Sequence, residues 1–211
     1  MKNINISNKI ILVYRICLLV LTLSTLIAGW SISAVESGLP LIWLNGFKFY
    51  TTQTNILVCA WLILAIMWYN KPEALKKIQG PLKGAFTLFI TTTFVFFAIL
   101  LQALYHPTGF AAFTNIILHY LTPIAFILDW ILTETEVRYK WKYLPYWTLY
   151  PISYLIFSFI HGSFTGDYIY PFLNINQRGL LGYIIVLIFL IGVGLIIGSL
   201  YIGINRKRTK S

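Results

Sequence analysis

Acidic residues are scarce in this sequence, with six Asp and Glu against sixteen Lys and Arg, which gives a formal net charge of +10. In a soluble protein such an excess would favour nucleic acid as a partner. Here only 10% of the residues are charged and 58% are hydrophobic, which is not the composition of a soluble domain. We therefore expect the basic excess to set a membrane orientation and to meet anionic lipid headgroups, with no nucleic acid bound.

Cysteine is also scarce, and several common motifs are missing. The two cysteines, Cys17 and Cys59, lie inside long apolar runs without metal-site spacing. The sequence has no G-x-S-x-G turn, no H-E-x-x-H helix and no phosphate-binding loop. It has no evident internal repeat, which counts against transporter folds built from duplicated halves. The first apolar run is too long for a cleavable signal peptide. No metal or cofactor is expected.

Six long apolar runs dominate the chain. Most approach or exceed the roughly 20 residues with which a helix crosses a hydrocarbon core. The runs are Ile10–Ile32, Thr51–Tyr69, Gly84–Leu104, Phe110–Leu132, Tyr146–His161 and Leu180–Gly203. The loops between them are too short to form a further domain, so residues 1–211 are expected to form one transmembrane domain.

The basic residues are distributed unevenly around these runs. Thirteen of the sixteen fall at the two ends and in the second and fourth gaps: Lys2, Lys9, Lys71, Lys76, Lys77, Lys83, Arg138, Lys140, Lys142, Arg206, Lys207, Arg208 and Lys210. Basic loops remain cytoplasmic. The sequence therefore predicts an all-α, polytopic bundle of six transmembrane helices in the cell membrane, with the N-terminus and the C-terminus in the cytoplasm.

Some local features lead to further expectations. Arg15, one turn inside the first run, is expected to extend to the cytoplasmic surface. The segment 70–83, with its proline and glycine breakers, is expected to be a solvated loop. Pro123 and Pro151 each remove a backbone donor from a helix and favour a kink. The small residues Gly192, Gly194 and Gly198 predict close helix packing of the last run, either within the monomer or between monomers.

Polar side chains gather in the outer half of the predicted bundle, where a bilayer makes them costly. They come from four helices: Thr51, Thr52, Thr54, Asn55, Gln102, Asn115, His119 and His161. Each has a structural alternative. A membrane Thr usually bonds its own helix backbone, and Asn55 and Asn115 are equally well read as contacts between helices. Asp129, nearer the cytoplasmic side, is more simply read as the partner of a nearby basic residue.

His119 differs because it lies about nine residues into its helix, roughly 13 Å deep at 1.5 Å per residue. A neutral imidazole can take the proton of a hydroxyl as that hydroxyl attacks an ester, and can then return it to the leaving group. Asn115, one helical turn away, is placed to orient the imidazole or to donate to an oxyanion. The residues alone leave this chemistry and a purely structural role both open.

Three segments resemble a known family. They are Lys48-Phe49-Tyr50-Thr51, the stretch from Asn115 to His119 with Asp129 ten residues on, and Thr165-Gly166-Asp-Tyr-Ile-Tyr170-Pro171-Phe172-Leu173. These are similar to the signature blocks of the androgen-induced gene / ADTRP family of six-helix membrane proteins, including its prokaryotic branch. The T-G-x-x-x-Y-P-F-L block is the most specific of the three.

This resemblance implies a membrane-embedded hydrolase of fatty-acid-type esters with a Thr nucleophile on the second helix and a His on the fourth. Thr51 resembles the nucleophile, His119 the catalytic histidine and Asp129 the acidic residue after it. The family's polar residue three positions after the nucleophile would instead fit Thr52 and Asn55, so both threonines stay candidates. His161 and Tyr170 are supporting candidates, and the aromatic loop 164–172 is expected to cover the opening.

Two other classes of function remain open from the sequence. A carrier or binding protein for a lipid or small molecule could use the same outer cavity without covalent chemistry. A structural subunit of a larger membrane assembly is the third possibility. The oligomeric state does not follow from the sequence.

Overall fold

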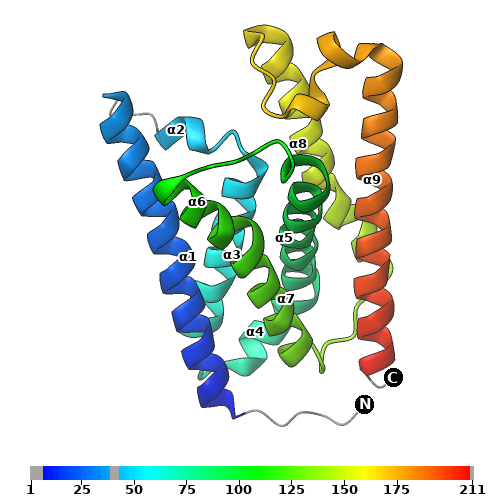
Figure 1. The fold of residues 1–211 in the computed structure, drawn as a ribbon. Coiled ribbons are helices and arrows are strands. Elements are labelled where there is room, and N and C mark those ends of the chain that lie inside the picture. The colour runs from blue at the N-terminus through cyan, green and yellow to red at the C-terminus, as the bar shows by residue number, and fades with distance from the viewer. Residues whose placement is uncertain (1–6, 39–42, 210–211) are drawn as a thin grey trace.

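The computed structural model describes residues 7–38 and 43–209, and every regular element in these ranges is helical (Figure 1). Lys2 and Lys210 of the terminal basic clusters lie outside the described residues. The α-helices are α1 Asn8–Ser37, α2 Trp43–Gly46, α3 Tyr50–Met67, α4 Pro72–Ile78, α5 Gly84–Phe96, α6 Gly109–Ile116, α7 Thr122–Thr133, α8 Tyr143–Thr165 and α9 Ile175–Arg208. Three π-helical turns, Gln79–Lys83, Phe97–Leu101 and Ile117–Leu121, join α4 to α5, extend α5 and join α6 to α7.

Five helical stretches of the described residues are long and apolar enough to cross a membrane: Asn8–Val35, Tyr50–Met67, Pro72–Leu101, Gly109–Thr133 and Ile175–Arg208. The all-helical fold expected from the sequence is confirmed for the described residues, and five of the helical stretches fit a membrane span by length and composition. The fifth predicted span, Tyr146–His161, corresponds to α8, which is 23 residues long but is not one of these five stretches. Its Tyr, Thr and Ser residues lower its mean hydropathy.

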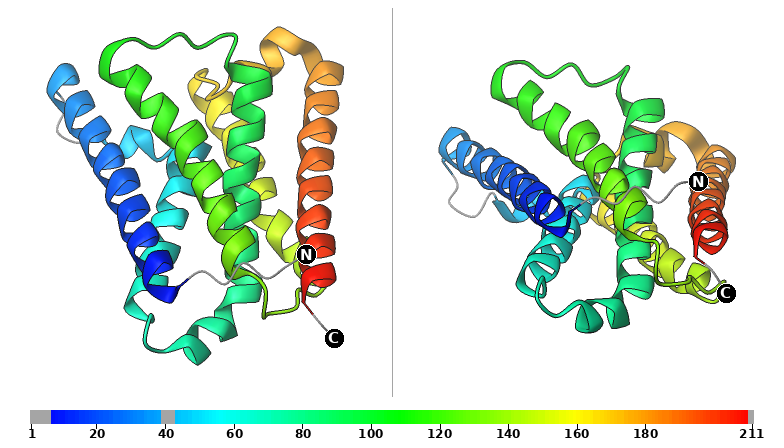
Figure 2. Two further views of the ribbon diagram at one scale, coloured as in Figure 1. Left: turned by 60° about the horizontal axis from the view of Figure 1, so that its bottom comes forward. Right: turned by 90° about the horizontal axis from the view of Figure 1, so that it is seen from below.

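Helix α5 is the centre of the bundle and contacts α3, α7, α8 and α9 (Figure 2). Helix α1 packs on α3 and α7 at one side, and α9 packs on α5 and α8 at the other. The start of α1, helix α4 and the last turn of α9 lie at the same end of the bundle (Figure 1). Because this end contains Lys9, Lys71, Lys76, Lys77 and Arg206–Arg208, we call it the basic end.

The segment 70–83 is not the solvated loop that the sequence predicted. Pro72 occupies the first turn of α4, where its missing N–H costs nothing, and a π-helical turn continues the chain into α5. The side chain of Lys83 at the end of that turn is fully buried. Pro72, Gly80 and Pro81 therefore lie within helical turns and not in a loop.

Arg15 does not extend to the surface as expected, because its guanidinium is buried and donates from Nε to Oδ1 of Asp129 at 2.8 Å. Within the monomer, the close packing expected at the glycines of α9 is present at one of the three positions. A Cβ added at Gly198 would lie 2.6 Å from Leu144, so α8 packs closely there. A Cβ added at Gly192 or Gly194 would meet nothing within 4 Å, so these two positions do not pack closely against another helix.

Candidate active site

Thr51 and His119 lie next to each other, as the sequence suggested. The Oγ1 atom of Thr51 is 3.0 Å from Nε2 of His119, and both residues are partly buried. Thr51 is the second residue of α3, and His119 lies in the π-helical turn between α6 and α7. Helix α3 starts at Tyr50, after the short helix α2, at the end of the bundle opposite to the basic end (Figure 1).

The first turn of α3 is held by tyrosines from another part of the chain. Phe49 at the N-cap provides no side-chain cap, so the amides of the first turn need other partners. The N–H of Tyr50 donates to the hydroxyls of Tyr154 and Tyr170, each at 3.1 Å. Tyr154 in turn donates to the carbonyl of Lys48 at 2.8 Å. These contacts fix the position of Thr51 relative to α8 and the segment after it.

Tyr170 also lies beside Thr51, because both residues line the same cavity and the Tyr170 hydroxyl accepts from the N–H of the neighbouring Tyr50. Burial raises the pKa of Tyr170, so its phenol stays protonated at neutral pH. A protonated phenol beside Thr51 can donate a hydrogen bond to an oxygen that develops negative charge there.

The protonation pattern of His119 follows from its second contact. Its Nδ1 is 3.2 Å from the backbone carbonyl of Asn115, and a carbonyl can only accept a hydrogen bond. Nδ1 therefore carries the proton in a neutral ring, which leaves Nε2 free to accept from the Thr51 hydroxyl. The ring also stacks on Phe97, with 3.9 Å between ring centroids, and this fixes its plane.

The π-helical turn that holds His119 leaves the carbonyl of Leu118 without its backbone donor. In π-helical register Pro123 would donate to the carbonyl of Leu118, but proline has no N–H. The side-chain amide of Asn55 replaces that donor at 3.1 Å, and it also donates to the carbonyl of Thr51 at 2.8 Å. A single side chain therefore bridges the two backbone segments that present Thr51 and His119.

The remaining supporting candidates have different positions. No hydrogen bond connects Thr52 to His119, whose hydroxyl partner is Thr51. Asn115 acts through its backbone carbonyl, while its own Oδ1 is buried without a partner. His161 lies at the end of α8, where Nδ1 contacts the carbonyl of Asp167 at 2.9 Å, and it does not join the Thr51–His119 pair.

Asp129 belongs to a different cluster, toward the basic end. It is bonded to Arg15 and Lys83, and Lys83 Nζ also lies 3.8 Å from Glu134. Glu134 accepts further hydrogen bonds from Gln79 and Tyr139. The simpler interpretation of Asp129, as the partner of basic residues, is the correct one, and it does not orient His119.

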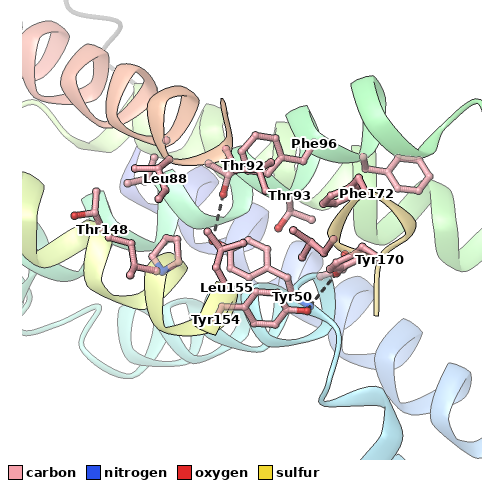
Figure 3. A pocket seen from close by; sticks show the side chains of 18 of the residues that line it. Tyr50, Leu88, Thr92, Thr93, Phe96, Thr148, Tyr154, Leu155, Tyr170 and Phe172 are labelled. Atoms are coloured by element: carbon pink, nitrogen blue, oxygen red, sulfur yellow. Dashed lines mark hydrogen bonds between the residues drawn. The ribbon is translucent and has the colours of Figure 1, made fainter. Parts of the chain in front are cut away.

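An apolar cavity of about 80 Å³ opens beside Thr51. Residues from α3, α5, α8, α9 and the segment 170–173 line it (Figure 3). Most of these are apolar or aromatic, including Phe96, Phe97, Leu155, Phe172 and Leu190. An apolar group can therefore enter directly beside the Thr51 hydroxyl.

The loop expected to cover the site does so only in part. Tyr170 and Phe172 line the cavity, whereas the Phe164 side chain is 87% exposed and points away from it. The loop is fastened by an ion pair of 2.6 Å between Lys48 Nζ and Asp167 Oδ2. The hydrogen bond and charge of Lys48 hold the pKa of Asp167 below its usual value.

Sequence reasoning missed several residues of this site. Tyr154 and Phe97 contact the reactive pair or its helix, but a Tyr or Phe in an apolar run gives no signal of its own. Pro123, noted only as a kink, gave the one usable hint of irregular backbone near His119. Within residues 7–38 and 43–209, no group of three His, Cys, Asp or Glu residues could hold a metal ion.

Comparisons with known proteins give limited information. The chain is 28% identical over 132 residues to a protein described as "Uncharacterized protein MG452 homolog" from Mycoplasma pneumoniae (strain ATCC 29342 / M129 / Subtype 1). The match covers 56% of this chain and 51% of that protein, so the chain spans about half the length of the relative it matches. No family model matches the chain, and no solved structure matches it.

Proposed function

We propose that this protein is a membrane-embedded hydrolase of acyl esters, with Thr51 as nucleophile and His119 as general base and acid. One observation carries the proposal: the Thr51 hydroxyl lies 3.0 Å from the free nitrogen of an imidazole whose other nitrogen is anchored to the Asn115 carbonyl. In Ser-His-Asp enzymes a carboxylate orients the histidine. Here a backbone carbonyl has that role, which agrees with the distant position of Asp129.

The first half of the reaction forms an acyl-enzyme. Nε2 of His119 takes the hydroxyl proton of Thr51 as Oγ1 attacks the ester carbonyl carbon. The phenol of Tyr170 donates to the resulting oxyanion. The bond from the carbonyl carbon to the alcohol oxygen then breaks, and the imidazolium gives its proton to the leaving alcohol.

The second half restores the enzyme. A water molecule gives a proton to Nε2 as its oxygen attacks the acyl carbon. The bond between that carbon and Oγ1 breaks, a fatty acid leaves, and Oγ1 regains its proton from the imidazolium. No metal or cofactor takes part in either half.

We extend the proposal to the membrane topology: α8 is a sixth span, both termini are cytoplasmic and the Thr51–His119 pair faces the outer half of the cell membrane. The gathering of basic side chains at one end of the bundle supports this orientation. Reporter fusions test it. A reporter enzyme that is active only outside the cytoplasm should be inactive when fused after residue 211 and active when inserted in the segment 105–108. The reverse pattern would overturn the orientation.

Labelling with a fluorophosphonate probe tests the reaction. Wild-type protein should be labelled, and should hydrolyse p-nitrophenyl acyl esters. Thr51→Ala and His119→Ala should lose both properties, with turnover reduced by roughly 10⁴-fold or more. Thr114→Ala is the control, because its hydroxyl bonds only the Ala111 carbonyl of its own helix.

Other outcomes would exclude the proposal. Labelling that survives in Thr51→Ala but is lost in Thr52→Ala would identify Thr52 as the nucleophile. Saturable binding of a fatty acid without labelling or turnover, unchanged in Thr51→Ser, would identify a lipid-binding or carrier protein instead.

A further inference from the structure

The apolar cavity continues past the Thr51–His119 pair toward the basic end of the bundle. Phe97 marks the level of the pair, because its ring stacks on His119. On the same helix the lining continues to Leu88, nine residues closer to the basic end, or about 13 Å at 1.5 Å per residue. We call the part of the cavity between Phe97 and Leu88 the inner limb.

The inner limb offers few polar groups to a ligand, and the hydroxyl of Tyr50 lies 3.2 Å from Oγ1 of Thr92. The threonine hydroxyls already have acceptors in the protein: Thr92 and Thr93 donate to the carbonyl of Phe89, at 2.8 and 3.1 Å, and Thr148 donates to the carbonyl of Pro145 at 2.9 Å. The other walls are apolar side chains such as Ile152 and Ile191. Such a space suits a hydrocarbon chain and offers little to a charged or sugar headgroup.

Gly194 is the smallest residue that lines this cavity. It lies one turn of α9 before Gly198, where an added Cβ would be 3.4 Å from Leu88 at the inner end of the limb. A Cβ added at Gly194 would meet no atom within 4 Å. The glycine therefore leaves room that a side chain would fill. Gly198, one turn further along α9, is different, because an added Cβ would lie 2.6 Å from Leu144.

We propose that the inner limb binds the unbranched hydrocarbon chain on the acyl side of the ester, and that Gly194 sets the longest chain accepted. The inference rests on the proposed ester hydrolysis, since it assigns the chain to the carbonyl that Thr51 attacks. It makes α9 the helix that determines specificity, although this helix contributes no group to the reaction.

The test compares Gly194→Leu with Gly192→Leu. Gly192 is two residues away on α9, does not line the cavity and has the same open space for a Cβ. Both changes replace a helix-interior glycine with a good helix former, so neither should impair folding. Their membrane insertion and helix content can be matched before turnover is compared.

The readout is the ratio of kcat/KM for p-nitrophenyl palmitate to that for p-nitrophenyl butyrate. Each methylene group that loses its place in the cavity reduces transition-state binding by roughly fourfold. Gly194→Leu should therefore lower the ratio by more than roughly tenfold once two such groups are displaced. Gly192→Leu should leave the ratio at its wild-type value. An unchanged ratio in Gly194→Leu would overturn the inference.

A binding experiment separates this inference from the proposed reaction. In a Thr51→Ala background, a photoreactive palmitate analogue should crosslink to residues of α5, α8 or α9, and Gly194→Leu should abolish that crosslink. If crosslinking follows this pattern but the wild type hydrolyses no ester, the reaction is wrong and the chain site stands. If esters are hydrolysed but crosslinks fall outside the cavity, the chain site is wrong.

Discussion

The buried charges near the basic end allow a sharp test of what holds the bundle together. Lys83 and Glu134 are both fully buried, with Nζ and Oε1 3.8 Å apart. Asp129 has a second cation, Arg15, at 2.8 Å. Replacing Lys83 with Met therefore leaves Asp129 paired and removes the one cation that lies within 4 Å of Glu134 among the residues that the structure describes.

Removing one partner of a buried ion pair costs roughly 3–5 kcal/mol, because the other charge is left without compensation. Lys83→Met should lower the free energy of unfolding by about that amount, which corresponds to roughly 10 °C in Tm for a chain of this size. Burial raises the pKa of Glu134, and loss of the ammonium group raises it further. A carboxyl group whose pKa is higher in the folded than in the unfolded protein makes the folded protein less stable as pH rises. The loss of stability in Lys83→Met should therefore grow from about pH 5 to about pH 8.

The double variant Lys83→Met/Glu134→Gln completes the experiment. A neutral Gln keeps an acceptor for Tyr139 and carries no charge, so the double variant should recover most of the lost stability. Lys77→Met is the control, because Lys77 is exposed in α4 and its loss should change stability by less than about 0.5 kcal/mol. Thermal unfolding in detergent measures all four proteins. A double variant as unstable as Lys83→Met, or a harmless Lys83→Met, would refute the reasoning.

Three further predictions concern the site and its loop. Asn55→Ala leaves the Leu118 carbonyl without a donor and should cost about 1–3 kcal/mol in thermal unfolding, together with most of the fluorophosphonate labelling; full labelling would remove Asn55 from the site. Gly162→Ala places a Cβ 2.3 Å from the Tyr168 ring and should cost about 1–3 kcal/mol, so unchanged unfolding would contradict the packing between α8 and the loop. Because the pKa of Asp167 is lowered by Lys48, the contact between them should persist at neutral pH and weaken as pH falls below about 4. Pulsed proteolysis of the loop should then rise with acidification in the wild type, whereas Lys48→Met should be cleaved readily at every pH.

The positions of the long helices could be read directly from the sequence. The last apolar run was predicted to begin at Leu180, and the backbone does leave helical geometry at Gly179, where φ is +67°. Apolar runs predict spans well because lipid leaves a backbone no partners except its own carbonyls. The same signal failed for the segment 70–83, because the π-helical turn at its end brings the polar Gln79 and Lys83 to the buried acids Glu134 and Asp129.

For the candidate site, the sequence supplied the residue types but not their arrangement. Thr51 starts one apolar run and His119 lies deep in another. Only the family resemblance and the predicted topology suggested that the two residues form a pair. Tyr154, Phe97 and the second role of Asn55 had no signal, because aromatic and amide residues in apolar runs usually serve packing alone. For Asp129, the interpretation that agrees with the structure is the one in which it pairs with a nearby basic residue.

The sequence by itself determined that the chain is helical, that several of its helices are apolar enough to span a membrane, and which polar side chains interrupt them. Only the tertiary structure decided that Thr51 meets His119, that Asn115 orients the imidazole through a carbonyl and that Asp129 pairs with Arg15 and Lys83. The physical reason is that hydropathy is a property of each segment alone. Hydrogen-bond geometry depends on how separate helices are rotated and shifted against one another, and here a proline and a π-helical turn set that shift.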